Sequence, residues 1–186
     1  MECFDKALEV APLMPEALVS KGVSLLIDFG KPEEAASLLE CALMSSPDWT
    51  VQWPHVWYWL GEAYRKSGSL TRALYWVEDG LHHQPGHLAL KRLMSEILED
   101  LVAQGSDVVQ KARCFWKAQV TEQPLDYNAR SLLARVEIQE GNKSTAWELL
   151  EESFDLVQVH PVVPCFCQPK RGPFDNRKGS HFCSMP

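Results

Sequence analysis

Side chains that commonly bind metals gather near the C-terminus of the 186-residue chain, where they could form a zinc site. This segment contains the pairs Cys165-x-Cys167 and His181-x-Cys183, and His160 lies shortly before them. Zinc is held tetrahedrally by four nitrogen or sulfur ligands, but its paired ligands are usually separated by two or more residues. We therefore predict a disordered tail without a metal, with a zinc site as the alternative.

Two further groups of residues resemble binding motifs more weakly. His82, His83 and His87 surround Pro85, but no thiolate or carboxylate joins them at the spacing of zinc ligands. The segment 141–145 reads Gly-Asn-Lys-Ser-Thr, yet a phosphate loop needs a glycine directly before the lysine and a strand that leads into it. We predict no metal site and no nucleotide or other cofactor site.

The sequence also lacks a combination of residues that predicts catalysis. A serine or cysteine nucleophile needs a base and an orienting group beside it, and the helical segments offer no such set. Acidic residues such as Glu33, Glu34, Glu151 and Glu152 fit solvent-exposed helix faces that keep a chain in solution. We predict that the chain is not an enzyme.

Composition limits the classes of function further. Hydrophobic residues make up 46% of the chain and charged residues 23%, which is typical of a globular protein. No apolar run reaches the roughly 20 residues of a membrane span, and the N-terminus lacks the features of a secretory signal. The net charge of −7 disfavours nucleic-acid binding, which depends on basic residues. We expect a cytoplasmic protein, with the nucleus as the alternative, that binds neither membranes nor nucleic acids.

The composition changes near Gln158. Residues 159–186 hold five of the 12 prolines, three of the six cysteines, and four basic residues against one acidic residue. We predict that this basic, Pro- and Cys-rich segment is a disordered tail.

The first 158 residues read as helices with regular punctuation. Apolar and small residues recur every three or four positions, and the alternation typical of strands is nearly absent. Prolines that end or begin helices lie 35, 38 and 39 residues apart, and glycines suited to left-handed helix C-caps lie in each unit. These residues are Pro12, Pro47, Pro85 and Pro124, with Gly30, Gly68, Gly105 and Gly141. A period of this length predicts an all-α solenoid of helix pairs.

One unit carries a specific pattern. Trp57-x-x-Leu60-Gly61-x-x-Tyr64 is followed by Ala73, Val77, Gly80 and Pro85. This series resembles the tetratricopeptide repeat, although the position of Val77 is usually aromatic. The large residues share one helix face and are expected to pack against the partner helix, while the small residues allow a close approach. The resemblance covers about 158 residues, more loosely outside this unit, and implies a right-handed solenoid of helical hairpins.

The resemblance divides the chain into repeats that differ in quality. Residues 1–12 match the second helix of a truncated repeat, 13–47 form a loose repeat, and 48–85 form the clearest one, with its best match at 54–85. Residues 86–124 are a divergent repeat, 125–158 are a further repeat, and 159–186 are the tail.

In such a solenoid, one face of the first helix of each pair lines a concave groove. The side chains on that face are expected to bind a partner. The predicted partner-binding residues are Val19, Val23, His55, Tyr58, Trp59, Glu62, Arg65, Arg92, Asn128, Ser131 and Arg135. The three arginines could grip carboxylates, whereas the alternative is a solvated face on which charged residues only pair with each other. Some proteins of this family clamp chaperone tails with a lysine and two asparagines, but Tyr58 and Glu62 stand at the matching positions here.

The resemblance implies a non-enzymatic adaptor or scaffold that binds a protein partner, as an extended segment or a helix, in this groove. Two alternatives remain open. The chain is a piece or isoform of a longer scaffold that assembles, or self-associates, through uncapped ends such as Phe4 and Leu8. Otherwise the repeats are the accessory arm of an enzyme whose catalytic domain lies elsewhere.

Overall fold

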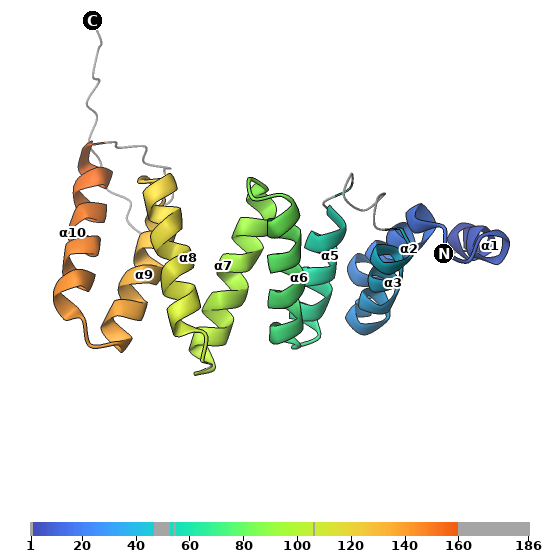
Figure 1. Ribbon diagram of the computed structural model, residues 1–186, viewed down its shortest axis with the longest axis horizontal. Coiled ribbons are helices and arrows are strands. Elements are labelled where there is room, and N and C mark those ends of the chain that lie inside the picture. Colours follow the sequence, from blue (N-terminus) through green and yellow to red (C-terminus); the bar gives the residue numbers. More distant parts are fainter. Residues whose placement is uncertain (1, 47–52, 54, 106, 160–186) are drawn as a thin grey trace, which may run out of the picture.

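The computed structural model describes residues 2–46, 53, 55–105 and 107–159, with side chains up to residue 154. Within these ranges every regular element is a helix, and the helices follow one another in a row from one end of the molecule to the other (Figure 1). They are α1 (Glu2–Val10), α2 (Pro15–Ile27), α3 (Pro32–Ser45), α5 (His55–Lys66), α6 (Leu70–His83), α7 (Leu88–Ala103), α8 (Val109–Glu122), α9 (Tyr127–Gln139) and α10 (Lys143–Val159).

The helices pack in antiparallel pairs, which we name by their order along the chain: α2–α3, α5–α6, α7–α8 and α9–α10. Pro15 and Pro32 occupy the first positions of α2 and α3, where a missing amide hydrogen costs nothing. All four glycines predicted at the C-caps have left-handed backbone conformations, with φ between 62° and 86°. The predicted all-α solenoid fold is therefore confirmed for the described residues.

The second pair shows why the large and small residues of the repeat pattern alternate. Trp57 and Leu60 are almost fully buried, and the indole nitrogen of Trp57 donates a hydrogen bond of 2.9 Å to Asp79. A Cβ atom on Gly61 would lie 2.5 Å from a methyl carbon of Val77, and one on Gly80 would lie 2.7 Å from Trp57. Only glycine leaves room for this packing.

The third pair is less regular than the others. Helices α7 and α8 diverge from the turn that joins them, whereas α5 and α6 run side by side (Figure 1). The long helix α7 packs instead on α5 and α6 of the preceding pair. The divergence leaves a space on the surface formed by α7, α8 and the start of α9.

Two cysteines of the helices differ in burial. The apolar residues around Cys114 in the sequence predict that it fills core volume, but its side chain is exposed. Cys41 is half-buried. Residues 160–186, which hold the candidate zinc ligands of the tail, lie outside the described residues. None of the described helices combines the length and apolarity needed to cross a lipid bilayer.

Candidate functional site

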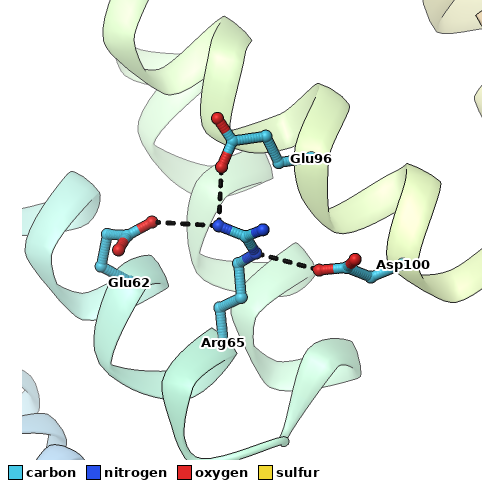
Figure 2. Close-up of polar contacts among 4 residues, drawn as sticks. All are labelled: Glu62, Arg65, Glu96 and Asp100. Atoms are coloured by element: carbon cyan, nitrogen blue, oxygen red, sulfur yellow. Dashed lines mark hydrogen bonds and ion pairs between the residues drawn. The ribbon is translucent and has the colours of Figure 1, made fainter. Parts of the chain in front are cut away.

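Arg65 lies at the centre of the surface formed by the first helices α5 and α7. Figure 2 shows its guanidinium among three carboxylates, those of Glu62 on the same helix and of Glu96 and Asp100 on α7. Its Nη1 atom is 2.6 Å from Oε2 of Glu96, and its Nε atom is 3.0 Å from Oδ2 of Asp100. Partial burial lowers the pKa of Arg65, but the hydrogen bond to Asp100 and the neighbouring carboxylates outweigh that effect and raise it. Arg65 is therefore a charged link between two repeats.

Arg135 is engaged in a similar way further along the same surface. Its Nη1 atom is 2.6 Å from Oε1 of Glu99, which joins α9 to α7. Two of the three arginines predicted to grip a partner's carboxylate thus already bind carboxylates of the chain itself. For Arg65 and Arg135, the structure matches the alternative in which charged residues of the groove pair with one another.

Arg92 differs from these two arginines. Its side chain is exposed, and it forms no ion pair with any residue that the structure describes. It borders two neighbouring clefts of this surface. The smaller cleft, of about 110 Å³, lies between α5 and α7 beside Tyr58 and Glu62. Burial and then the charges of Glu62 and Glu96 raise the pKa of Tyr58, so its phenol remains a neutral donor at physiological pH.

The larger cleft has a volume of about 440 Å³ and lies where α7 and α8 diverge. Its walls are α7 from Leu88 to Glu99, residues Phe115 and Gln119 of α8, and residues 123–129 at the junction of α8 and α9. Arg92 and Asn128, both predicted as partner-binding residues, line the same cleft. We call this cleft the α7–α9 cleft.

The charged groups around Arg92 in the α7–α9 cleft are already paired. Glu96 and Glu99 bind Arg65 and Arg135, and Asp126 accepts a hydrogen bond of 3.0 Å from the backbone of Ala129 at the start of α9. Lys91 forms an ion pair with Glu122. Among the described residues, Arg92 is therefore the cation of this cleft that forms no ion pair.

The remaining predicted residues lie outside the α7–α9 cleft. Val19 and Val23 are half-buried on α2, and Val19 packs against the core. Trp59 is half-buried and its ring meets that of Tyr58 edge to face, with 5.1 Å between the ring centroids. His55 is exposed and contacts His87 edge to face.

Ser131 on α9 is exposed and does not line the cleft either. The structure thus brings Arg92 and Asn128 together, places Tyr58 and Glu62 beside Arg92, and leaves the valines on α2 apart.

Sequence reasoning missed several residues of this surface. Asp100 binds Arg65 but was not predicted, although its spacing of four from Glu96 puts both on one helix face. Phe115 and Gln119 belong to a second helix, which a regular repeat would hide from the groove. They line the cleft that lies where α7 and α8 diverge, and the sequence showed only that residues 86–124 depart from the regular repeat.

The histidines that flank Pro85 have structural contacts. His83 stacks on Trp57 with 5.1 Å between ring centroids, and Nδ1 of His87 accepts a hydrogen bond from the backbone of Leu90 and so caps α7. Among the described residues, no group of three histidine, cysteine or acidic side chains is arranged to hold a metal ion.

Comparison with solved structures identifies the fold. A crystal structure of MamA superimposes with a TM-score of 0.71 at 14% sequence identity, covering 90% of this chain and 86% of that chain. The structure of YrrB, described as a TPR protein with an unusual peptide-binding site, gives a TM-score of 0.68 at 18% identity and covers 85% of this chain and 76% of that one. PilF of Pseudomonas aeruginosa gives 0.58 at 17% identity, covering 87% and 68% of the respective chains.

No protein-family model matches the sequence, and comparison with curated proteins also finds no match. The structural similarity, at identities below one fifth, establishes the fold and not a shared activity. The chain has the tetratricopeptide-repeat fold.

Proposed function

We propose that this chain is a non-enzymatic interaction adaptor that binds a segment of a partner protein on the surface formed by its first helices, centred on the α7–α9 cleft. The observation that carries this proposal is the position of Arg92. It is exposed, it forms no ion pair with a described residue, and it lines a cleft of about 440 Å³ together with Asn128. Solenoids of this kind commonly bind extended segments or helices on their concave side.

The chemistry of the cleft indicates the class of segment that it fits. A guanidinium binds a carboxylate through two parallel hydrogen bonds, and the amides of Asn128 and Gln119 can donate to a peptide backbone. Phe115 and the exposed Leu88 supply apolar surface at the same place. A segment with an acidic residue next to an apolar residue satisfies both features.

Arg65 and Arg135 have a different role in this proposal. Because their charges are neutralised by α7, they hold neighbouring first helices in register and do not contact the partner's acidic group. Tyr58, Glu62 and Trp59 extend the surface toward the N-terminus as secondary contacts. YrrB, which has the same fold, is described as binding a peptide, and this likeness supports peptide binding only by analogy of fold.

A displayed library of short peptides, selected against the full chain, tests this proposal. We expect the selected peptides to share an acidic residue beside an apolar one, and to bind Arg92→Glu at least about tenfold more weakly than the wild type. Asn128→Ala should weaken binding less, because it removes one neutral hydrogen bond. Lys117→Glu is the matched control, since Lys117 is exposed on α8 outside the cleft.

Peptides that bind Arg92→Glu and the wild type equally well would contradict the assignment of the cleft. Circular dichroism and thermal unfolding of each variant show whether a loss of binding reflects a loss of fold.

A further inference from the structure

The last helix of the stack presents an apolar stripe to solvent. Trp147, Leu150 and Phe154 on α10 are 69%, 41% and 63% exposed. Their spacing of three and four residues puts them on one face of the helix. Figure 1 places α10 at the end of the row, opposite α1. None of the three residues lines the α7–α9 cleft.

The central position of this stripe, that of Leu150, is buried in every earlier repeat. Alignment of the repeats at Ala35, Ala73, Ala112 and Ala146 makes Leu150 equivalent to three residues in the preceding second helices. These are Leu39, Val77 and Trp116, which are 0%, 0% and 1% exposed. The stripe on α10 is thus a repeat-to-repeat packing surface that no described residue covers.

The equivalent surface of the second pair is covered by helix α7, which shows what kind of element fits it. Helix α7 packs on α5 and α6, and its Leu90 lies 3.0 Å from the position of a Cβ atom on Gly80. Leu93, three residues later, lies 2.9 Å from the corresponding position on Gly61. Ile97 follows and is fully buried. The fitting element is therefore a helix with apolar residues at positions i, i+3 and i+7.

A glutamate beside the stripe indicates the charge of that helix. Glu151 is equivalent to Glu40, Glu78 and Lys117 of the preceding repeats. The two glutamates each bind donor groups of the repeat that follows them. Glu40 accepts hydrogen bonds from Tyr64 and from Trp76, and Glu78 binds Nζ of Lys111 at 2.7 Å.

Glu151 and its neighbour Glu148 have no ion pair with any residue that the structure describes. Among the described residues, no apolar helix packs on this surface and no cation pairs with Glu148 or Glu151. Two carboxylates side by side favour a positively charged hydrogen-bond donor.

A second copy of this chain fits this surface poorly. Its helix α1 contains three acidic residues and one lysine, and the α10 stripe of another copy would bring Glu148 and Glu151 of both copies together. Like charges at such short distances oppose association.

We propose that the α10 stripe binds an amphipathic helix of a partner protein, with apolar residues at i, i+3 and i+7 and lysine or arginine residues along the edge that meets Glu148 and Glu151. This helix occupies the position that α7 holds on the second pair. The proposal concerns a different surface from the α7–α9 cleft and does not depend on it.

A pair of synthetic peptides tests this inference on the full chain. The basic probe has the sequence of residues 88–103 with Glu96, Glu99 and Asp100 replaced by lysine, and the control probe keeps the three acids. We expect the basic probe to bind the wild type, and Leu150→Glu to weaken that binding at least about tenfold, as truncation of a central contact does. Trp147→Ser should act in the same direction. Glu151→Lys should remove the preference for the basic probe.

Tyr75→Glu is the matched control, because Tyr75 is also an exposed aromatic residue but lies on α6 away from the stripe. Three results would each overturn the proposal. The first is equal binding of the basic probe to the wild type and to Leu150→Glu, or no binding to either. The second is equal binding of the acidic and basic probes to the wild type. The third is self-association of the wild type in sedimentation experiments that Leu150→Glu abolishes, which would make a second copy the occupant.

Discussion

The guanidinium of Arg65 on α5 binds the carboxylate of Glu96 on α7, with 2.6 Å between Nη1 and Oε2. The two residues stand on the first helices of consecutive repeats, so this pair ties the helices together on the surface proposed to bind a partner (Figure 2). Because this contact already engages the guanidinium of Arg65, we assign the proposed binding of a partner's carboxylate to Arg92.

Replacement of Arg65 by glutamine should therefore destabilise the fold more than it alters binding. It leaves Glu62, Glu96 and Asp100 without their shared cation, and we expect a loss of about 1 kcal/mol in the free energy of unfolding because all four groups are partly solvated. Urea unfolding at low and high salt measures this loss. Additional replacement of Glu96 and Asp100 by their amides should restore part of it. If the Arg65→Gln variant were as stable as the wild type at low salt, the cluster would not contribute to the stability of the fold.

The glycines of the second repeat provide a packing test. Gly61→Ala and Gly80→Ala each place a methyl group within 3.0 Å of neighbouring side chains, and we expect each to lower the free energy of unfolding by about 1–3 kcal/mol. Gly86→Ala is the control, since a Cβ atom there meets nothing within 4 Å. Thermal unfolding of the three variants distinguishes them. Equal stability of Gly61→Ala and Gly86→Ala would contradict the packing described here.

A buried carboxylate on α9 has one cationic partner, an arginine on α8. Glu137 is 3% exposed and accepts two hydrogen bonds from Arg113, at 2.6 Å and 2.7 Å, and one from the amide of Asn142 at 2.8 Å. Arg113→Ala should destabilise the chain by about 3 kcal/mol, because it leaves a buried charge without its partner.

Arg113 occupies the position of Leu74 in the second repeat. Replacement of both Arg113 and Glu137 by leucine should therefore recover most of the stability lost in Arg113→Ala. Chemical denaturation of the single and double variants decides this, and a double variant less stable than the single one would show that the pair is worth more than apolar packing.

The hydrogen bond from Tyr64 to Glu40 predicts a dependence of stability on pH. Burial, followed by this hydrogen bond, raises the pKa of Tyr64 above 10.0. Since the neutral phenol is the favoured form in the fold, its contribution is complete below the unfolded pKa and is lost as the pH rises through the folded pKa. Tyr64→Phe should cost about 1 kcal/mol at neutral pH, and the difference from the wild type should shrink as the pH rises above about 10.

Parallel urea titrations of the two proteins over this range isolate the contribution of Tyr64, because other titrating groups are common to both. A difference that stays constant with pH would mean that the phenol proton does not contribute to the fold.

The helix pairs were predictable from the sequence because their turns and their helix–helix contacts depend on residues close together in the chain. Glycine at positions 30, 68, 105 and 141 allows the left-handed turn, and Trp57 with Gly80 encodes the fit of one helix on the other. These are short-range constraints that recur with the period of the repeat.

The geometry of the site was less predictable, because it depends on contacts between repeats. The sequence placed Arg65, Arg92 and Arg135 on the same stripe, but it could not show that α7 supplies carboxylates to two of them. The α7–α9 cleft arises from the angle between α7 and α8, which follows from how the long helix α7 packs on the preceding pair.

The central claim is that Arg92 binds an acidic residue of a partner segment in the α7–α9 cleft. A charge-swap titration tests it most directly, with one selected acidic peptide and a version in which its acidic residue is lysine, each titrated against the wild type and Arg92→Glu by fluorescence anisotropy. We predict that the acidic peptide binds the wild type at least about tenfold more tightly than Arg92→Glu, and that the lysine peptide shows the reverse preference. The claim would be contradicted if the lysine peptide bound the wild type weakly, the acidic peptide bound Arg92→Glu weakly, and the lysine peptide bound Arg92→Glu no better than either of these.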